Sequence, residues 1–312
     1  MEKMDCKLYF APMEGVTGPV LRRVHKDLFG GVDNYFTPFL AANKNHCFKH
    51  RETREFLPYD STLVPQVLAS NPQDFIWAAG VLRQAGYKEV NLNLGCPMPT
   101  IVTKKKGSGL LRDLDYLDRY LDEIFKGDNL PNISVKTRTG FENNDNAAAI
   151  GKIYAKYPFC EVIIHPRARE DYYNGTPDIE AFINMKEQLS CPVCYNGDIR
   201  TVEGFESLRN ELKDIDRFMI GRGLLANPAL ALAIRGNNDK SDKASLLEYL
   251  SVLWDEYSEE LSGEKAILFK MKELWYYLEW QYPEASKEIN AIRKSKTAAE
   301  YKQHVVKALA VR

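Results

Sequence analysis

The sequence predicts an α/β protein, a (β/α)8 TIM barrel followed by a C-terminal helical bundle. The barrel is predicted because short apolar runs alternate with helix-length segments eight times before Arg235, which matches a TIM barrel in number and in size. The bundle is predicted because the apolar period becomes helical beyond Arg235. A doubly wound open sheet is the alternative, but it usually has fewer units and a glycine-rich fingerprint after its first strand, which this sequence lacks.

The predicted strands are bounded by turn signals and helix caps. Pro19, Asn71, Asp113 and Thr201 are expected to begin helices, because each is a residue type favoured at a helix start. Residues 41–61 are interpreted as a polar, basic connection. With the turns that end them, the eight predicted strands are Leu8–Gly18, Asn34–Leu40, Thr62–Ser70, Glu89–Gly95, Ile133–Arg138, Glu161–Arg167, Pro192–Asp198 and Arg217–Gly223.

Residues 1–235 are therefore expected to form the catalytic barrel, and residues 236–312 a helical domain. Leu246, Leu250 and Leu253 fall on one helical face of that domain. Its last segment, Lys287–Arg312, carries seven cationic and two acidic residues, a local charge of +5. This segment is either a nucleic-acid footprint or a solvated helix face, and the charge alone does not choose between them.

Bulk composition favours a folded, cytoplasmic protein. The chain has 312 residues, of which 45% are hydrophobic and 11% aromatic, so it can bury a substantial core. The net charge of −1 gives no global attraction for nucleic acid. We expect no membrane segment, because no apolar run is long enough to span a bilayer and residues 1–8 are charged. We also expect a monomer, reduced cysteines and no metal; Cys191 and Cys194 form a C-x-x-C but lack a second ligand pair, which favours structural thiols.

One stretch, Glu89–Leu111, combines a strand with a reactive loop. The strand alternates asparagines with apolar residues and ends at Gly95-Cys96. The loop that follows carries Lys104, Lys105 and Lys106 and a Gly-Ser-Gly turn. A cysteine at the carboxyl end of a barrel strand lies where active sites form, so this stretch predicts chemistry on a charged substrate or cofactor.

Other strand ends carry polar residues that favour a ligand. Lys136 lies within a strand, and no acidic residue occupies the matching position of a neighbouring strand, which favours an anionic ligand over a buried ion pair. His165 follows an apolar run and is either a ligand-facing or a core histidine. The Asn-Gly-Asp at 196–198 and the Gly-Arg-Gly at 221–223 together predict a phosphate-binding corner such as that for flavin mononucleotide.

These motifs carry a resemblance to a known family. The segments APMEGVT, LVPQVLAS, NLNLGCPMP followed by KKKGSGLL, VKTRTGF, IIHPRAR, CYNGDI and MIGRGLLANP resemble the dihydrouridine synthase family in order and spacing over nearly the whole chain. The resemblance implies FMN at the barrel mouth, NADPH as reductant, and reduction of the C5–C6 double bond of uridines in tRNA. It also implies that the helical domain recognises RNA.

The resemblance assigns roles to individual residues. It implies that Cys96 is the acid that protonates C5, a role suited to a thiol, which is mostly protonated at neutral pH. Substrate contacts are expected from Asn93, Arg138, Arg167, Lys104, Lys105 and Lys106. Cofactor contacts are expected from Ala11, Pro12, Met13, Gln66, Lys136, His165, Asn196, Gly197, Asp198, Gly221 and Arg222.

The sequence also departs from the family pattern and leaves rivals open. Thr37-Pro38, Leu68-Ala69 and His165-Pro166-Arg167-Ala168 replace the usual residues after strands 2, 3 and 6. These changes affect the RNA pocket and leave the cysteine, lysine and histidine in place. The rivals are the same reaction on ribosomal RNA, a flavin barrel acting on a free pyrimidine in the manner of dihydroorotate dehydrogenases, and a non-catalytic RNA-binding factor.

Overall fold

The computed structural model describes residues 6–237 and 242–311. Residues 1–5, part of the polar linker (238–241) and Arg312 of the basic segment lie outside this range. The described residues divide into two compact units. One unit comprises residues 1–32, 199–213 and 220–312, and the other comprises residues 33–198 and 214–219. None of the described helices is both long and apolar enough to cross a membrane.

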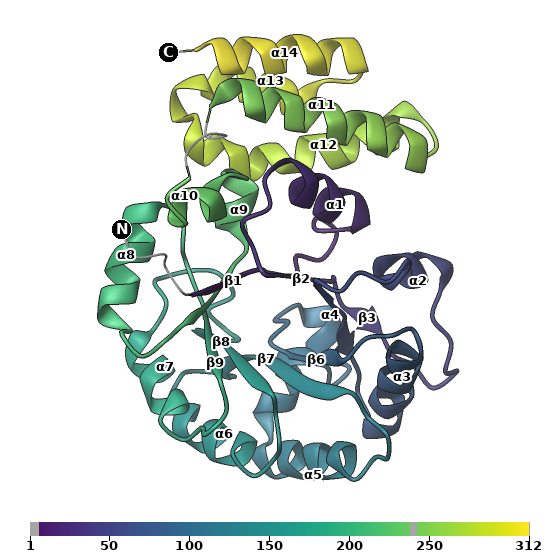
Figure 1. Ribbon diagram of the computed structural model, residues 1–312, viewed down its shortest axis with the longest axis vertical. Helices are drawn as coiled ribbons and strands as arrows, with labels where there is room; N and C mark the ends of the chain where they lie inside the picture. The colour runs from purple at the N-terminus through teal and green to yellow at the C-terminus, as the bar shows by residue number, and fades with distance from the viewer. Residues whose placement is uncertain (1–5, 238–241, 312) are drawn as a thin grey trace. The chain divides into compact units, whose positions relative to one another are not determined.

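The strands of the second unit lie side by side and pair in parallel (Figure 1). In order across the sheet they are β3, β5, β6, β7, β8, β9 and β10, and β2 pairs with β4. The strands of the chain are β1 (Lys7–Phe10), β2 (Asn34–Phe36), β3 (Leu40–Ala41), β4 (Leu63–Val64), β5 (Gln66–Leu68), β6 (Glu89–Leu94), β7 (Asn132–Gly140), β8 (Glu161–Ala168), β9 (Val193–Asn196) and β10 (Arg217–Ile220).

Two predicted strands are each divided in two. The second predicted strand becomes β2 and β3, separated by Thr37-Pro38-Phe39, and the third becomes β4 and β5, separated by Pro65. Proline has no N–H group to donate to a neighbouring strand, so it interrupts the ladder at both places. The remaining predicted strands are each a single strand, and the alternation of parallel strands with helices confirms the predicted α/β class.

Helices follow the strands, and α3, α5, α6 and α7 lie outside the sheet of the second unit (Figure 1). The expected caps Asn71, Asp113 and Thr201 are present, because each side chain accepts a hydrogen bond from the first turn, and Asp178 caps α7 in the same way. The helices are α1 (Pro19–Leu28), α2 (His50–Phe56), α3 (Pro72–Gln84), α4 (Pro99–Val102), α5 (Leu114–Phe125), α6 (Ala147–Tyr154), α7 (Ile179–Lys186), α8 (Val202–Glu211), α9 (Arg222–Ala226) and α10 (Leu230–Ile234).

The polar, basic connection at residues 41–61 contains one helix, α2. Glu52 explains this helix, because its carboxylate accepts a hydrogen bond from the N–H of Lys49 (2.9 Å) at the helix start and from the N–H of Ala41 (3.1 Å) in β3. An acidic residue three positions after a helix start is a known sequence signal, and Glu52 stands three positions after Lys49.

The C-terminal residues form the predicted helical bundle within the first unit (Figure 1). Leu250, Leu253, Met271 and Trp275 are buried between its helices. The bundle consists of α11 (Lys243–Glu260), α12 (Glu264–Leu278), α13 (Ser286–Lys294) and α14 (Ala298–Ala310), with short 3-10 turns at Glu279–Gln281 and Pro283–Ala285.

Candidate active site

The carboxyl ends of β5 to β8 bring several predicted site residues together. Strand register pairs Asn93 of β6 with Lys136 of β7, and Arg138 of β7 with His165 of β8. The amide of Asn93 also donates to the side-chain oxygen of Gln66 in β5 (2.7 Å). These five side chains therefore form one polar cluster across four neighbouring strands.

Cys96 lies directly after β6 on a loop that is held from several directions. Its N–H donates to Oδ1 of Asn93 (3.0 Å), and its carbonyl accepts a hydrogen bond from the hydroxyl of Ser108 (2.8 Å). Gly107 has a positive φ of 55°, and a Cβ atom there would lie 2.9 Å from the carbonyl oxygen of Cys96. The Gly-Ser-Gly turn begins a 3-10 helix, Gly107–Arg112, that packs against the cysteine. This packing explains why glycine occupies position 107.

Lys136 is a partly buried cation near the cysteine. Its pKa is lowered from 10.5 to about 8, first by burial and then by the positive charge of Arg138, while Cys96 and Cys194 act in the opposite direction. Within residues 6–237 and 242–311, no carboxylate pairs with Lys136. The structure therefore leaves this ammonium group without an anion from the described chain, as the sequence predicts.

Arg138 clamps the loop that carries the cysteine. Its three nitrogens donate to the carbonyls of Gly95 (3.0 Å), Ala168 (2.7 Å) and Tyr172 (2.6 Å), and its side chain is 1% exposed. Burial lowers its pKa to about 10. These contacts hold Gly95 beside Cys96, and a contact between Arg138 and a substrate stays a prediction.

Arg167 joins His165 to Asp198. One of its terminal nitrogens donates to Nε2 of His165 (3.0 Å), and the other pairs with the carboxylate of Asp198 (2.9 Å). Since an arginine can only donate, Nε2 of His165 accepts and the ring carries its proton on Nδ1. Arg167 is 1% exposed, so it orients the histidine from within the protein.

Asn196 and Gly197 occupy the end of β9. The amide of Asn196 donates to the carbonyl of Met219 in β10 (2.8 Å). A Cβ atom at Gly197 would lie 2.2 Å from the hydroxyl of Tyr195, so this position has no room for a side chain.

The other predicted cofactor residues lie in the first unit. The N–H of Ala11 donates to the carbonyl of Ile220 of the same unit (2.8 Å). A Cβ atom at Gly221 would lie 3.3 Å from Cβ of Ala11 and 3.4 Å from Sδ of Met13. Pro12 lies between Ala11 and Met13, and Arg222 begins α9. Five predicted residues are thus grouped in this unit.

The three loop lysines differ in their surroundings. Lys104 and Lys105 are exposed, and Lys105 lies over the ring of Tyr116, 5.7 Å from its centroid. Lys106 is half-buried and donates to the carbonyl of Ala42 (3.0 Å), and burial lowers its pKa. Only the first two of these lysines present their side chains to solvent.

The Cys191 and Cys194 thiols show no sign of activation. Burial raises the pKa of both thiols, that of Cys194 well above its usual value. No group of three potential ligands that could hold a metal ion occurs in the part of the chain that the structure describes. A raised thiol pKa favours a structural role for both cysteines.

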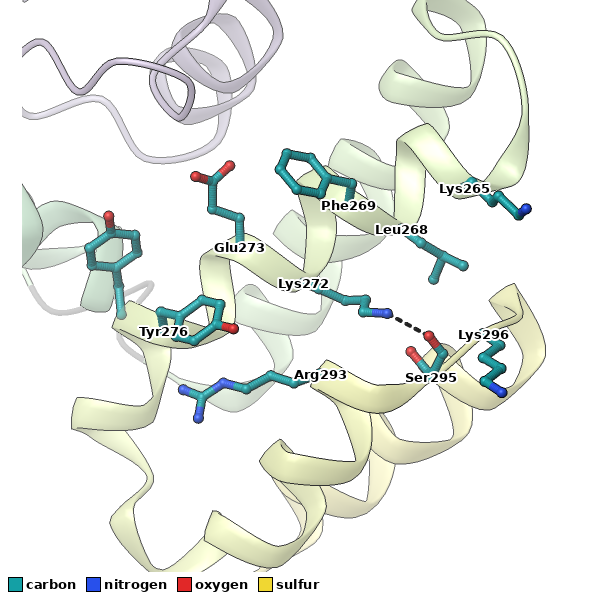
Figure 2. Close-up of a pocket in the computed structure, with 10 residues that line it drawn as sticks. Lys265, Leu268, Phe269, Lys272, Glu273, Tyr276, Arg293, Ser295 and Lys296 are labelled. Carbon is teal, nitrogen blue, oxygen red and sulfur yellow. Dashed lines mark hydrogen bonds between the residues drawn. The ribbon is translucent and has the colours of Figure 1, made fainter. Parts of the chain in front are cut away.

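A cavity of about 590 Å³ lies between α12 and α13 in the C-terminal bundle (Figure 2). Tyr276 and Arg293 point toward each other there, with the guanidinium 4.4 Å from the ring centroid. Phe269 and Tyr276 are 67% and 60% exposed. The cavity is lined by four cationic side chains, Lys265, Lys272, Arg293 and Lys296, and one acidic side chain, Glu273. The sequence indicates the basic segment, Lys287–Arg312, but does not predict this cavity.

The fold and the strand-end cluster define an α/β-barrel enzyme. Among solved structures, morphinone reductase shares this barrel fold with a TM-score of 0.53 at 11% identity, over 77% of this chain and 88% of that chain. Histamine dehydrogenase from Rhizobium sp. 4-9 gives a TM-score of 0.55 at 11% identity, over 80% of this chain and 49% of that chain. Both similarities show the TIM-barrel fold alone.

The protein-family model "Dihydrouridine synthase (Dus)" matches residues 9–310. The chain therefore belongs to the dihydrouridine synthase family, as the motifs predict. It is 27% identical to tRNA-dihydrouridine synthase B of Pasteurella multocida, over 89% of this chain and 85% of that protein. It is also 27% identical to tRNA-dihydrouridine(16) synthase of Pseudomonas syringae pv. tomato, over 92% of this chain and 94% of that protein.

Proposed function

We propose that this protein is an FMN-dependent, NADPH-using synthase that reduces specific uridines of tRNA to 5,6-dihydrouridine in the cytoplasm. The observation that carries the proposal is Lys136, a partly buried cation near Cys96 without a carboxylate partner in the described chain. Such a cation is costly unless an anionic group binds beside it. Family membership and the names of the relatives support the substrate.

The residues present fit a bound FMN. Lys136 offers positive charge to the electron-rich edge of the ring system, and Gln66, 1% exposed, offers a fixed amide. Gly197 has no room for a side chain of its own, which suits a position where the backbone approaches a phosphate group. The resemblance adds Ala11, Pro12, Met13, His165, Asn196, Asp198, Gly221 and Arg222 to these residues.

When bound, FMN would supply the hydride chemistry needed to reduce the uracil ring. Cys96 donates its thiol proton to C5, which completes the saturation of the double bond. Asn93 holds the base, and Arg138 and Ser108 hold the loop so that the thiol stays at one place. Lys136 stabilises the negative charge that accompanies reduction.

The C-terminal bundle is proposed to recognise RNA through the cavity between α12 and α13. RNA-binding proteins hold unstacked bases on aromatic or arginine planes and hold phosphates with cations. Tyr276 with Arg293 provides the plane, Phe269 provides a second exposed ring, and Lys265 and Lys296 provide the charge. The exposed Lys104 and Lys105 of the active-site loop are further candidates for the RNA backbone.

The test compares substrates. Purified protein supplied with FMN and NADPH is incubated with unmodified tRNA, ribosomal RNA and free uracil, and dihydrouridine is mapped in each product. We expect dihydrouridine in tRNA only. Reduction of free uracil at the same rate would support the small-substrate flavin barrel, and salt-sensitive RNA binding without reduction would support a binding factor. Dihydrouridine is mapped at every position of the tRNA, because the relatives named tRNA-dihydrouridine synthase B and tRNA-dihydrouridine(16) synthase are each 27% identical to this chain.

A further inference from the structure

A chain of hydrogen bonds links side chains of β5, β6 and β7 and ends at two members of the strand-end cluster, Gln66 and Asn93. It begins at Glu89, whose carboxylate accepts from the hydroxyl of Ser134 (2.5 Å). The Ser134 oxygen accepts from the amide nitrogen of Asn91 (2.9 Å). The Asn91 oxygen accepts from the amide nitrogen of Gln66 (2.8 Å), and the Gln66 oxygen accepts from that of Asn93 (2.7 Å). Five side chains are thus linked, and four of them donate in one direction, toward Glu89.

Both ends of this chain impose the same direction. At one end Glu89 is a carboxylate, which only accepts. At the other end Oδ1 of Asn93 accepts from the N–H groups of Gly95 (3.1 Å) and Cys96 (3.0 Å), which only donate. If any amide between them turned over, two donors or two acceptors would face each other. The orientation of every amide is therefore determined by the chain as a whole.

Burial makes this orientation strict. Asn91 and Ser134 have no exposed surface, and Gln66 is 1% exposed. Water cannot replace a lost hydrogen bond at such positions, so a reversed amide leaves buried groups unsatisfied. In this series of hydrogen bonds, Glu89, Ser134 and Asn91 come before Gln66 and Asn93. The family resemblance assigns no role to these first three residues.

The consequence for Asn93 is that it can only donate to a ligand. Its oxygen already accepts two backbone hydrogen bonds, which occupy both lone pairs. Its nitrogen uses one of two protons on Gln66. The remaining N–H is the one polar group that Asn93 can offer.

We propose that Glu89, Ser134 and Asn91 are positioning residues that hold the Gln66 oxygen toward the Asn93 nitrogen. With its own oxygen fixed by the N–H groups of Gly95 and Cys96, Asn93 then presents its one remaining N–H at a fixed place and selects a pyrimidine with a carbonyl at C4. Uracil has an acceptor oxygen at C4, whereas cytosine has an amino group that donates and would face the Asn93 N–H. This inference rests on the proposed function, because it concerns the base that the same site reduces.

The test uses an isosteric pair at position 91. Asn91→Leu removes both hydrogen bonds at similar volume, whereas Asn91→Asp, when protonated, keeps one donor and one acceptor. We expect Asn91→Leu to slow single-turnover uridine reduction about 10-fold, the upper end for losing the one hydrogen bond from Asn93 to the base. Asn91→Asp should stay within about threefold of wild type. FMN content and tRNA affinity should stay unchanged in both variants.

A second experiment tests the N–H donor of Asn93 directly. In tRNA transcripts made with 4-thiouridine, the C4 oxygen is replaced by sulfur, a weaker acceptor. The slowing caused by this replacement should be smaller in Asn91→Leu than in wild type and unchanged in Asn91→Asp. In flavin-free protein, NMR should show faster hydrogen exchange at the Asn93 side-chain amide in Asn91→Leu. If Asn91→Leu does not fold, Ser134→Ala, which removes the link to Glu89, takes its place.

Three results would overturn the inference. They are full activity in Asn91→Leu, equal slowing in Asn91→Leu and Asn91→Asp, or the same sulfur effect in all variants. Loss of FMN in step with activity would also count against it, because that indicates a structural role alone. A wild type that reduces neither transcript would instead overturn the proposed function, and the inference with it.

Discussion

The polar residues at the barrel strand ends and the aromatic rings of the C-terminal cavity are held in opposite ways. At the strand ends, Arg138, Gln66 and Asn91 are almost completely buried, and each has two or more hydrogen-bond partners. Around the cavity, Phe269 and Tyr276 are mostly exposed. Proton transfer at one atom requires fixed geometry, whereas binding a flexible phosphate backbone tolerates movement. The difference fits the proposal that the strand ends carry the chemistry and the cavity carries the recognition.

The largest expected effect is at Cys96. Cys96→Ala should slow uridine reduction on the order of 10² to 10⁴-fold, because it removes the proton donor to C5. The flavin absorbance spectrum and the affinity for tRNA should be retained. The matched control is Cys191→Ala, which alters a thiol outside the cluster and should keep full activity. If Cys96→Ala reduced uridine at the wild-type rate, a group other than Cys96 would have to donate the proton to C5.

Lys136 is expected to have the next largest effect. Lys136→Met keeps the length of the side chain and removes its charge, so reduction should slow on the order of 10²-fold. Lys152→Met is the control, since that lysine is exposed on α6 and belongs to no predicted site. Equal losses in the two variants, measured as single-turnover rates, would contradict a specific role for Lys136.

The cavity of the bundle should affect binding and not chemistry. Tyr276→Ala should weaken tRNA binding about 10-fold, the effect expected from losing one stacked base, with the single-turnover rate at saturating tRNA unchanged. Lys213→Ala, an exposed lysine outside the cavity, serves as the control. A Tyr276→Ala variant that binds tRNA as tightly as wild type would contradict a role of the cavity in tRNA binding.

A separate expected effect, on stability and not on activity, is a pH dependence. The pKa of Lys136 in the folded, flavin-free protein is about 8, below its ordinary value of 10.5. Burying the charged form therefore costs stability below pH 8, and this cost fades as the pH rises from 8 to 10.5. Lys136→Met should be more stable than wild type at pH 7 by on the order of 2 kcal/mol, with the difference gone above pH 10.5. Chemical denaturation at both pH values measures it, and a difference that is independent of pH would contradict the lowered pKa.

The sequence predicted the barrel and the residues at its strand ends because both follow from alternation along the chain. Lys136 stood out for a local reason, since a cation within an apolar strand is costly. The breaks at Pro38 and Pro65 could have been predicted from proline alone, and helix α2 from the acidic residue at position 52.

Contacts between distant segments could not be predicted in the same way. Asn91 and Asn93 stand two positions apart, which places both on one face of β6, but their partners Ser134 and Gln66 come from other strands. The cavity of the bundle likewise combines Phe269 and Tyr276 of α12 with Arg293 of α13 and Lys296 beyond it. Such arrangements depend on strand register and helix packing, which one sequence does not specify.

The most direct test of the central claim is anaerobic reduction followed by addition of RNA. Protein loaded with FMN is reduced by one equivalent of NADPH, and unmodified tRNA is then added. The account predicts that the flavin absorbance returns in step with the formation of one dihydrouridine per oxidised flavin. Return of the absorbance without dihydrouridine, or a protein that does not retain FMN, would contradict it.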